Sequence, residues 1–73
     1  MKGTLAKTYP NVAYWITGRG RIELGEEYYS ESIIRVIDEG GLVWEGREHY
    51  NTLEEALAEA DAAIGKWLQG EEP

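Results

Sequence analysis

The alternation of apolar and polar residues predicts a β-hairpin in the first third of the chain. Residues 12–17 are rich in aromatic and β-branched side chains, which favour a strand. A glycine-containing triplet at 18–20 then leads into a second alternating segment at 21–24. Pairing Thr17 with Arg21 separates an apolar face from a mixed face. The apolar face would carry Val12, Tyr14, Ile16, Ile22 and Leu24.

A second hairpin is predicted from residues 31–38 and 42–45, joined by a three-residue turn at 39–41. With Asp38 opposite Leu42, the side chains of both strands separate into an apolar and a mixed face. The apolar face would carry Ile34, Val36, Leu42 and Trp44. In this register Arg35 faces Glu45, an opposite-charge pair worth about 0.2–1 kcal/mol.

The last element is a helix that begins with a capping box, in which Thr52 is the N-cap and Glu55 lies three residues later. Apolar residues then recur at three- and four-residue steps along one stripe. The stripe consists of Leu53, Ala56, Leu57, Ala60, Ile64, Trp67 and Leu68. Gly70 is a suitable C-cap. Gly65, which costs about 1 kcal/mol relative to alanine, marks either a close backbone approach or nothing.

These elements predict an α+β, two-layer fold: a four-stranded antiparallel β-meander followed by one C-terminal α-helix packed on one face. A chain of 73 residues forms a single domain. Within it we expect residues 1–11 and 70–73 to be less ordered. Because one helix covers only one face of a sheet, the outer face would stay open.

That outer face is the predicted interaction surface, since an apolar centre with a charged rim is typical of interfaces. Its candidate residues are Trp15, Arg21, Ile33, Arg35, Ile37 and Val43. We expect a protein contact there, most simply a two-fold homodimer, which would also support a domain too small to bury a large core. The alternatives are that the chain's own ends cover this face, or that the sheet tolerates exposed apolar residues.

The charge of the chain narrows the choice of partners. A net charge of −7 disfavours binding to nucleic acid and to anionic membrane surfaces. The absence of cysteine excludes disulfides and thiolate zinc sites. No apolar run approaches the ~20 residues that span a bilayer, and no signal peptide is recognisable, so we expect a cytoplasmic protein.

Few residues are candidates for chemistry. His49 is the only histidine and lies near Glu45 and Glu48, which could form part of a metal site, but a polar loop before the helix is the simpler interpretation. We therefore expect no metal, no cofactor and no catalytic residue. The groups that could be combined for nucleophilic catalysis, without a spacing that brings them together, are Ser30, Ser32, Thr17 and His49. The adjacent Tyr28 and Tyr29 are a possible recognition handle in a loop.

Two resemblances to known families add to these predictions. The runs IIRVIDEGGLVWEG (33–46) and YNTLEEAL (50–57) resemble small bacterial proteins of unknown function, notably cyanobacterial ones, which implies a compact α+β domain without an assigned site. Residues 46–68 are similar to the strand-to-helix step of HicB-type antitoxins, which implies a small toxin as partner. This chain departs from that family in lacking its Pro-Gly-containing segment before the last turn.

The leading expectation is a non-enzymatic protein-interaction or accessory domain that self-associates through the outer sheet face. One alternative is an antitoxin-like protein that binds a basic partner through the acidic face of its helix. The other is a small enzyme with an unrecognised site.

Overall fold

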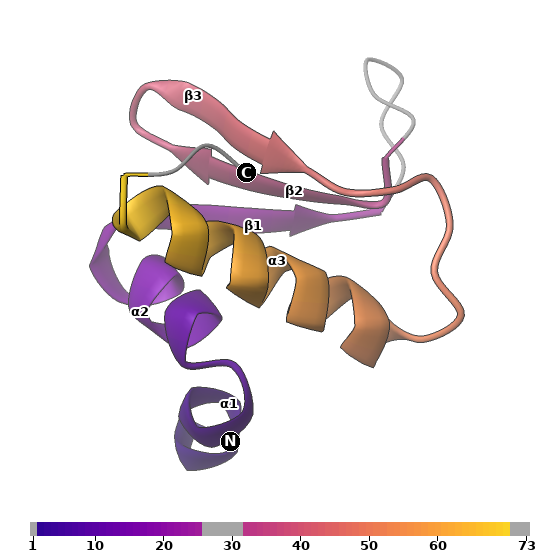
Figure 1. The fold of residues 1–73 in the computed structure, drawn as a ribbon, viewed down its shortest axis with the longest axis horizontal. Helices are drawn as coiled ribbons and strands as arrows, with labels where there is room; N and C mark the ends of the chain where they lie inside the picture. The colour runs from indigo at the N-terminus through magenta and orange to yellow at the C-terminus, as the bar shows by residue number, and fades with distance from the viewer. Residues whose placement is uncertain (1, 26–31, 71–73) are drawn as a thin grey trace.

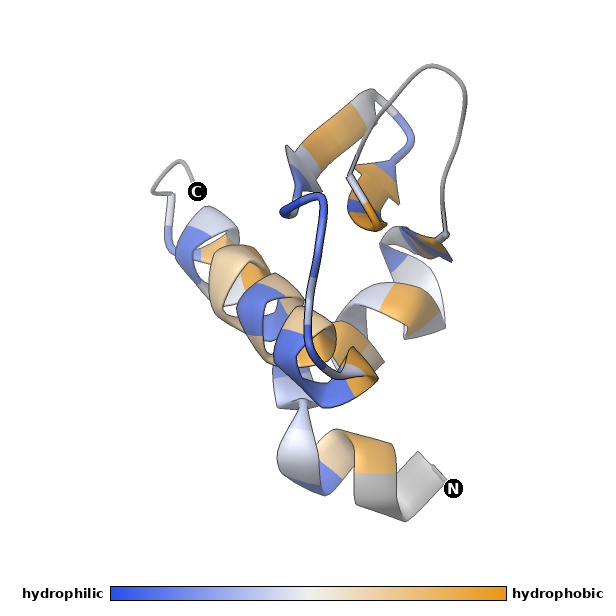
Figure 2. Cartoon of the chain, turned by 90° about the vertical axis from the view of Figure 1, so that its right-hand side faces the viewer, coloured by the Kyte–Doolittle hydropathy of each residue, from blue (hydrophilic) through white to orange (hydrophobic). Residues whose placement is uncertain are grey.

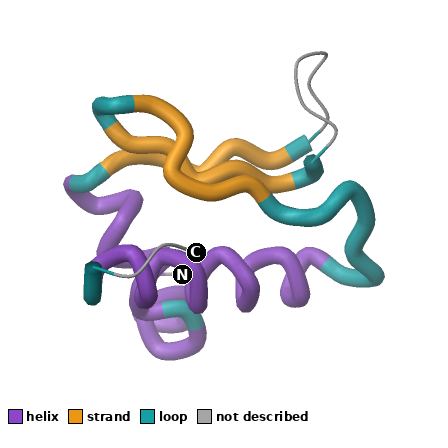
Figure 3. Tube along the Cα trace, turned by 45° about the horizontal axis from the view of Figure 1, so that its top comes forward, coloured by secondary structure: helices purple, strands orange, loops and turns teal. Residues whose placement is uncertain are grey.

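The structure, a computed structural model, describes residues 2–25 and 32–70. Its elements in chain order are α1 (Lys2–Thr8), α2 (Pro10–Gly18), β1 (Gly20–Leu24), β2 (Ile34–Asp38), β3 (Gly41–Glu45) and α3 (Leu53–Leu68). The strands form one layer and the helices lie beneath it, with α1 at the far end from the sheet (Figures 1 and 3). The predicted four-stranded meander is wrong: within the described residues the sheet has three antiparallel strands in the order β1-β2-β3, and helices precede as well as follow it.

The error lies in residues 12–17, which form most of α2 instead of a strand. Pro10 occupies the start of α2, where its missing N–H costs nothing and its fixed φ suits a helix. The carboxylate of Asp61 on α3 accepts hydrogen bonds from the backbone N–H groups of Asn11, at 2.8 Å, and Val12, at 3.0 Å. This side chain caps α2 from 49 residues away, and so outweighs the strand preference of the local composition.

Gly65 lets the two helices meet at this cap. A Cβ on Gly65 would lie 2.8 Å from Nδ2 of Asn11, which itself donates to the backbone oxygen of Asp61 at 3.1 Å. The group that approaches Gly65 is thus the Asn11 side chain and not a second backbone.

The strand registers confirm part of the second predicted hairpin and replace the first. Strand β1 pairs with β2, so that Glu23 lies opposite Arg35. Between β2 and β3 the expected pairing of Arg35 with Glu45 is confirmed. Asp38, however, lies opposite Gly41 and not opposite Leu42. Gly41 takes a positive φ of 117°, which lets the chain turn one residue earlier than expected.

The extra residue in β3 is taken up by a bulge. Ile37 pairs with Leu42 while the preceding Val36 pairs with Trp44, which leaves Val43 as the additional residue. The bulge restores the predicted pairing toward the end of β3.

The predicted C-terminal helix is confirmed: Thr52 is its N-cap, and the Thr52 hydroxyl accepts from the backbone N–H of Glu55 at 3.1 Å. The core forms where α2 and α3 meet one face of the sheet. Its buried members are Val12, Trp15, Ile34, Val36, Ala56, Ala60 and Ile64. Two of them, Val12 and Trp15, come from the segment expected to be a strand.

Trp15 is fully buried and connects α2 with the sheet and with α3. Its indole N–H donates to the backbone oxygen of Ile37 on β2 at 3.1 Å. Its ring meets that of Trp67 edge-on at 5.3 Å, and the Arg19 guanidinium lies over both rings. Gly20 allows this close approach, because a Cβ there would overlap the same Ile37 oxygen.

Candidate functional site

The residues predicted to form an open outer sheet face do not do so together. Trp15 is 0% exposed, Arg35 1% and Ile37 9%. Arg21 is well exposed, whereas Ile33 and Val43 are half-buried. Trp15 is in the core because it belongs to a helix and not to an outward-facing strand position. The three buried side chains add nothing to a contact surface.

Arg35 is buried because the ends of the β1–β2 connection supply its partners. Its Nη1 donates to the backbone oxygen of Ser32 at 2.6 Å and its Nη2 to that of Gly25 at 2.8 Å. Its Nε lies 3.3 Å from Oε1 of Glu23 on the neighbouring strand. Two carbonyls and a carboxylate compensate the guanidinium for its lost hydration. Arg35 therefore clamps the two strands. The tyrosine pair 28–29 and Ser30 lie outside the described residues.

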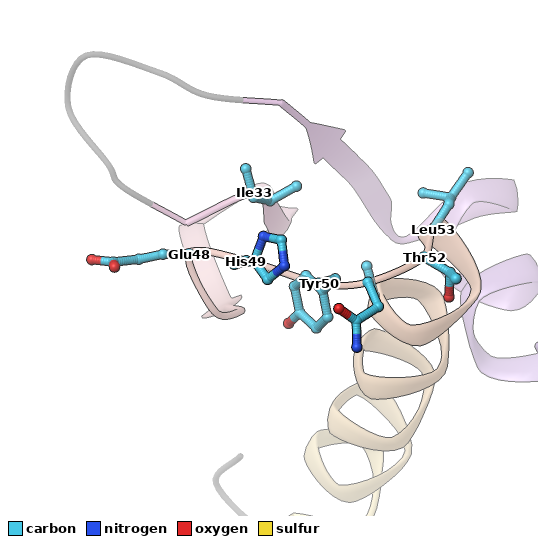
Figure 4. A pocket seen from close by; sticks show the side chains of 8 residues that line it. Ile33, Glu48, His49, Tyr50, Thr52 and Leu53 are labelled. Carbon is cyan, nitrogen blue, oxygen red and sulfur yellow. The ribbon is translucent and has the colours of Figure 1, made fainter.

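The loop before α3 contains a hollow of about 320 Å³ that includes His49 (Figure 4). The His49 side chain is exposed, and Glu48 extends away from it. Within residues 2–25 and 32–70, no three or more His, Cys, Asp or Glu side chains gather as they would around a metal ion. The hollow is lined by Ile33, Glu48, His49, Tyr50, Asn51, Thr52, Leu53 and Ala56.

Next to this hollow, Arg47, Tyr50 and Glu59 form a network that holds the β3–α3 connection on α3. The Tyr50 hydroxyl donates to Oε1 of Glu59 at 3.0 Å and accepts from the Arg47 backbone N–H at 2.9 Å. The Arg47 guanidinium reaches Oε2 of Glu59 at 2.8 Å and stacks over the Tyr50 ring. Burial raises the pKa of the Tyr50 hydroxyl, and the Glu59 carboxylate adds to the rise.

The acidic face of α3 is largely engaged within the chain. Of the four acids in this helix, Glu59 binds Arg47 and Tyr50, and Asp61 caps α2. Glu55 accepts from the Asn51 N–H at 3.2 Å. A basic partner would have to compete with these contacts.

A surface that sequence reasoning missed lies between α1 and α2. Leu5, Ala6, Ala13, Ile16 and Thr17 line a hollow of about 470 Å³, here called the α1–α2 groove. Ile16 is 47% exposed. Apolar colouring extends over part of α1, which stands away from the sheet (Figure 2).

The sequence did carry a signal for this groove. Pro10 at a helix start, followed by apolar residues in steps of three and four, indicates a helix over the segment that was interpreted as a strand. Charge gives a second signal: residues 1–22 contain four basic and no acidic residues, whereas residues 23–73 contain three basic and 14 acidic residues. More than half of the basic residues are therefore concentrated at the end of the chain that forms the groove.

Comparison of the chain with protein-family models, curated proteins and solved structures gave no match in any of the three. Among the described residues no helix is long and apolar enough to cross a membrane. The resemblances to small cyanobacterial proteins and to HicB-type antitoxins stay predictions.

Proposed function

We propose that this chain is a non-catalytic protein-binding domain whose partner binds in the α1–α2 groove. The observation that carries the proposal is that the apolar surface of α2 extends beyond its buried side. Val12 and Trp15 are buried against α3 and the sheet, while Ala13 and Ile16 line the groove. A helix of a globular protein normally presents one apolar stripe to the core and polar residues to solvent. A partner protein would supply the missing cover.

The lining of the groove favours a protein over a small molecule. Sites for small molecules combine apolar walls with a few polar groups that fix the orientation of the ligand. The polar side chain in this lining is Thr17, and its hydroxyl already donates to the backbone oxygen of Ala13 at 2.6 Å. The groove therefore offers apolar contact, which suits the side chains of a docked segment.

Charge indicates the chemistry of that segment. Lys7, which lies on α1 next to the groove residue Ala6, is exposed, and residues 1–22 contain no acid. A segment with one or two large apolar side chains flanked by Asp or Glu complements this surface. The other two hypotheses have less support. Three of the four acids of α3 have partners within the chain. The groups with shifted pKa values, Arg47 and Tyr50, bind one another and Glu59.

Site-specific photo-cross-linking tests the proposal. A photo-reactive amino acid replaces Ile16 in the groove or Leu42 in β3, and the full chain is expressed in its native host cells. The two sites are matched, since Ile16 is 47% and Leu42 56% exposed. We expect discrete protein adducts from position 16 and not from position 42. If position 16 gave no discrete adduct, or if both positions gave the same set, the proposal would be refuted.

A further inference from the structure

We infer that this chain also forms a two-fold dimer in which α3 packs antiparallel on α3 of a second copy, with Lys66 of each copy beside Glu59 of the other. The inference goes beyond the proposed function because it uses a different surface. It is independent of what binds in the α1–α2 groove.

The surface is a hollow of about 200 Å³ on the flank of α3 that faces β3. Trp44, Glu59, Ala62, Ala63 and Lys66 line it. The opposite flank of α3 contacts α2 through Asp61, whereas this flank is open to a second molecule. Ala62 is exposed and has a minimal side chain, which lets a second helix approach closely.

The charges on this flank are complementary to themselves under two-fold symmetry. Glu59 lies three residues before Ala62, and Lys66 lies three residues after Ala63. A two-fold axis between the two alanines therefore places each Glu59 beside the Lys66 of the other antiparallel helix. The two positions are about 10.5 Å apart along the helix axis, so both contacts form at once. An isologous interface requires this kind of self-complementarity.

Both groups can make the contact. No ion pair between described residues includes Lys66. Glu59 already binds Arg47 and Tyr50, but its side chain is 42% exposed. A carboxylate has about four lone-pair sites, so it can accept a further donor. The second copy thus supplies Lys66 with its counter-ion.

The dimer should be weak. Helix α3 has 16 residues and is about 24 Å long, so the contact is at the small end of specific interfaces, below about 1,200 Å². Each copy also carries a net charge of −7, which opposes association over a longer range. Salt would screen this repulsion and the Lys66 contacts together. A charge-matched variant is therefore a sharper test than a salt series.

The test is sedimentation equilibrium of the full chain between about 10 µM and 1 mM, the range in which weak interfaces associate. For the wild type we expect the average mass to rise from 8.2 kDa toward twice that value. Lys66→Glu should weaken the dimer about tenfold, because two contacts each worth a factor of up to about five become repulsive. Lys7→Glu is the control, since it changes the net charge equally at an exposed site on α1. We expect it to change the dissociation constant by less than about twofold.

A mixture of two variants adds a positive test. Glu59→Lys and Lys66→Glu each place like charges opposite one another, whereas an equimolar mixture restores both opposite-charge contacts. The mixture should associate more tightly than either variant alone, with the helix content of each checked by circular dichroism.

Three results would overturn the inference. One is a wild type that remains at 8.2 kDa at 1 mM, as expected if α3 binds a different protein. The second is an equal effect of Lys7→Glu and Lys66→Glu, and the third is a mixture that associates no better than its components. None of these results bears on cross-linking at Ile16, so failure of the dimer is distinguishable from failure of the proposed function.

Discussion

Replacing Asp61 by alanine removes the cap that holds α2 in its helical form. Its carboxylate accepts the N–H groups of Asn11 and Val12 at 2.8 and 3.0 Å. A capping contact is worth about 0.5–2 kcal/mol. The attraction between a carboxylate and the start of a helix adds about 0.3–1 kcal/mol. Alanine has the better helix propensity, and this restores about 0.5 kcal/mol in α3. The expected net loss in the free energy of unfolding is about 1–2 kcal/mol.

Urea denaturation followed by tryptophan fluorescence measures this loss, because Trp15 and Trp67 report on the junction of α2 with α3. In a domain of 73 residues each kcal/mol also lowers the melting temperature by about 4–8 °C. Glu54→Ala is the matched control, since it removes the same charge from an exposed position of the same helix. The reasoning is refuted if Asp61→Ala destabilises the protein no more than Glu54→Ala does.

Three further predictions follow from individual contacts. Gly20→Ala should lower the free energy of unfolding by at least about 2 kcal/mol, because the new Cβ would overlap the Ile37 backbone oxygen. The control is Gly18→Ala, whose Cβ has nothing within 4 Å. In thermal melts we expect this control to be as stable as the wild type or more stable. Arg35→Ala should cost about 1–3 kcal/mol in urea unfolding, since it removes the donor of the Ser32 carbonyl, in a buried contact, and of the Gly25 carbonyl, in a part-buried one. A loss below about 0.5 kcal/mol, typical of surface sites, would contradict the clamp. The raised pKa of Tyr50 means that the folded state holds the phenolic proton more tightly than the unfolded state. The contribution of Tyr50 to stability should therefore be fully present below the ordinary tyrosine pKa of about 10 and be lost as pH rises above it. Tyr50→Phe should lose this part of the alkaline decline, and an unchanged difference between the two proteins from pH 8 to 11 would speak against it.

The elements that sequence reasoning predicted correctly are those whose stabilising contacts are close together in the chain. The Thr52 N-cap acts within one turn of α3, and the pairing of Arg35 with Glu45 spans a short hairpin. Local patterns specify such elements because both partners lie in one sequence window.

The segment 12–17 was predicted wrongly because its conformation is decided elsewhere. Strand-forming side chains fill it, but Asp61 caps it and Trp67 packs on its tryptophan. In the same way Arg35 looked like a rim residue, and only the Ser32 and Gly25 carbonyls explain its burial. The α1–α2 groove exists because 12–17 is a helix, so it could not be predicted while that segment was interpreted as a strand.

The central claim is that residues 10–18 form a helix which buries Trp15 and presents Ile16 to a partner. Backbone NMR of the isolated chain tests it most directly. We predict Cα chemical shifts displaced to the helical side throughout 10–18, together with a slowly exchanging Trp15 indole proton. Strand-type shifts with cross-strand contacts between Ile16 and Ile22 would contradict the account, because they would restore the hairpin and remove the groove.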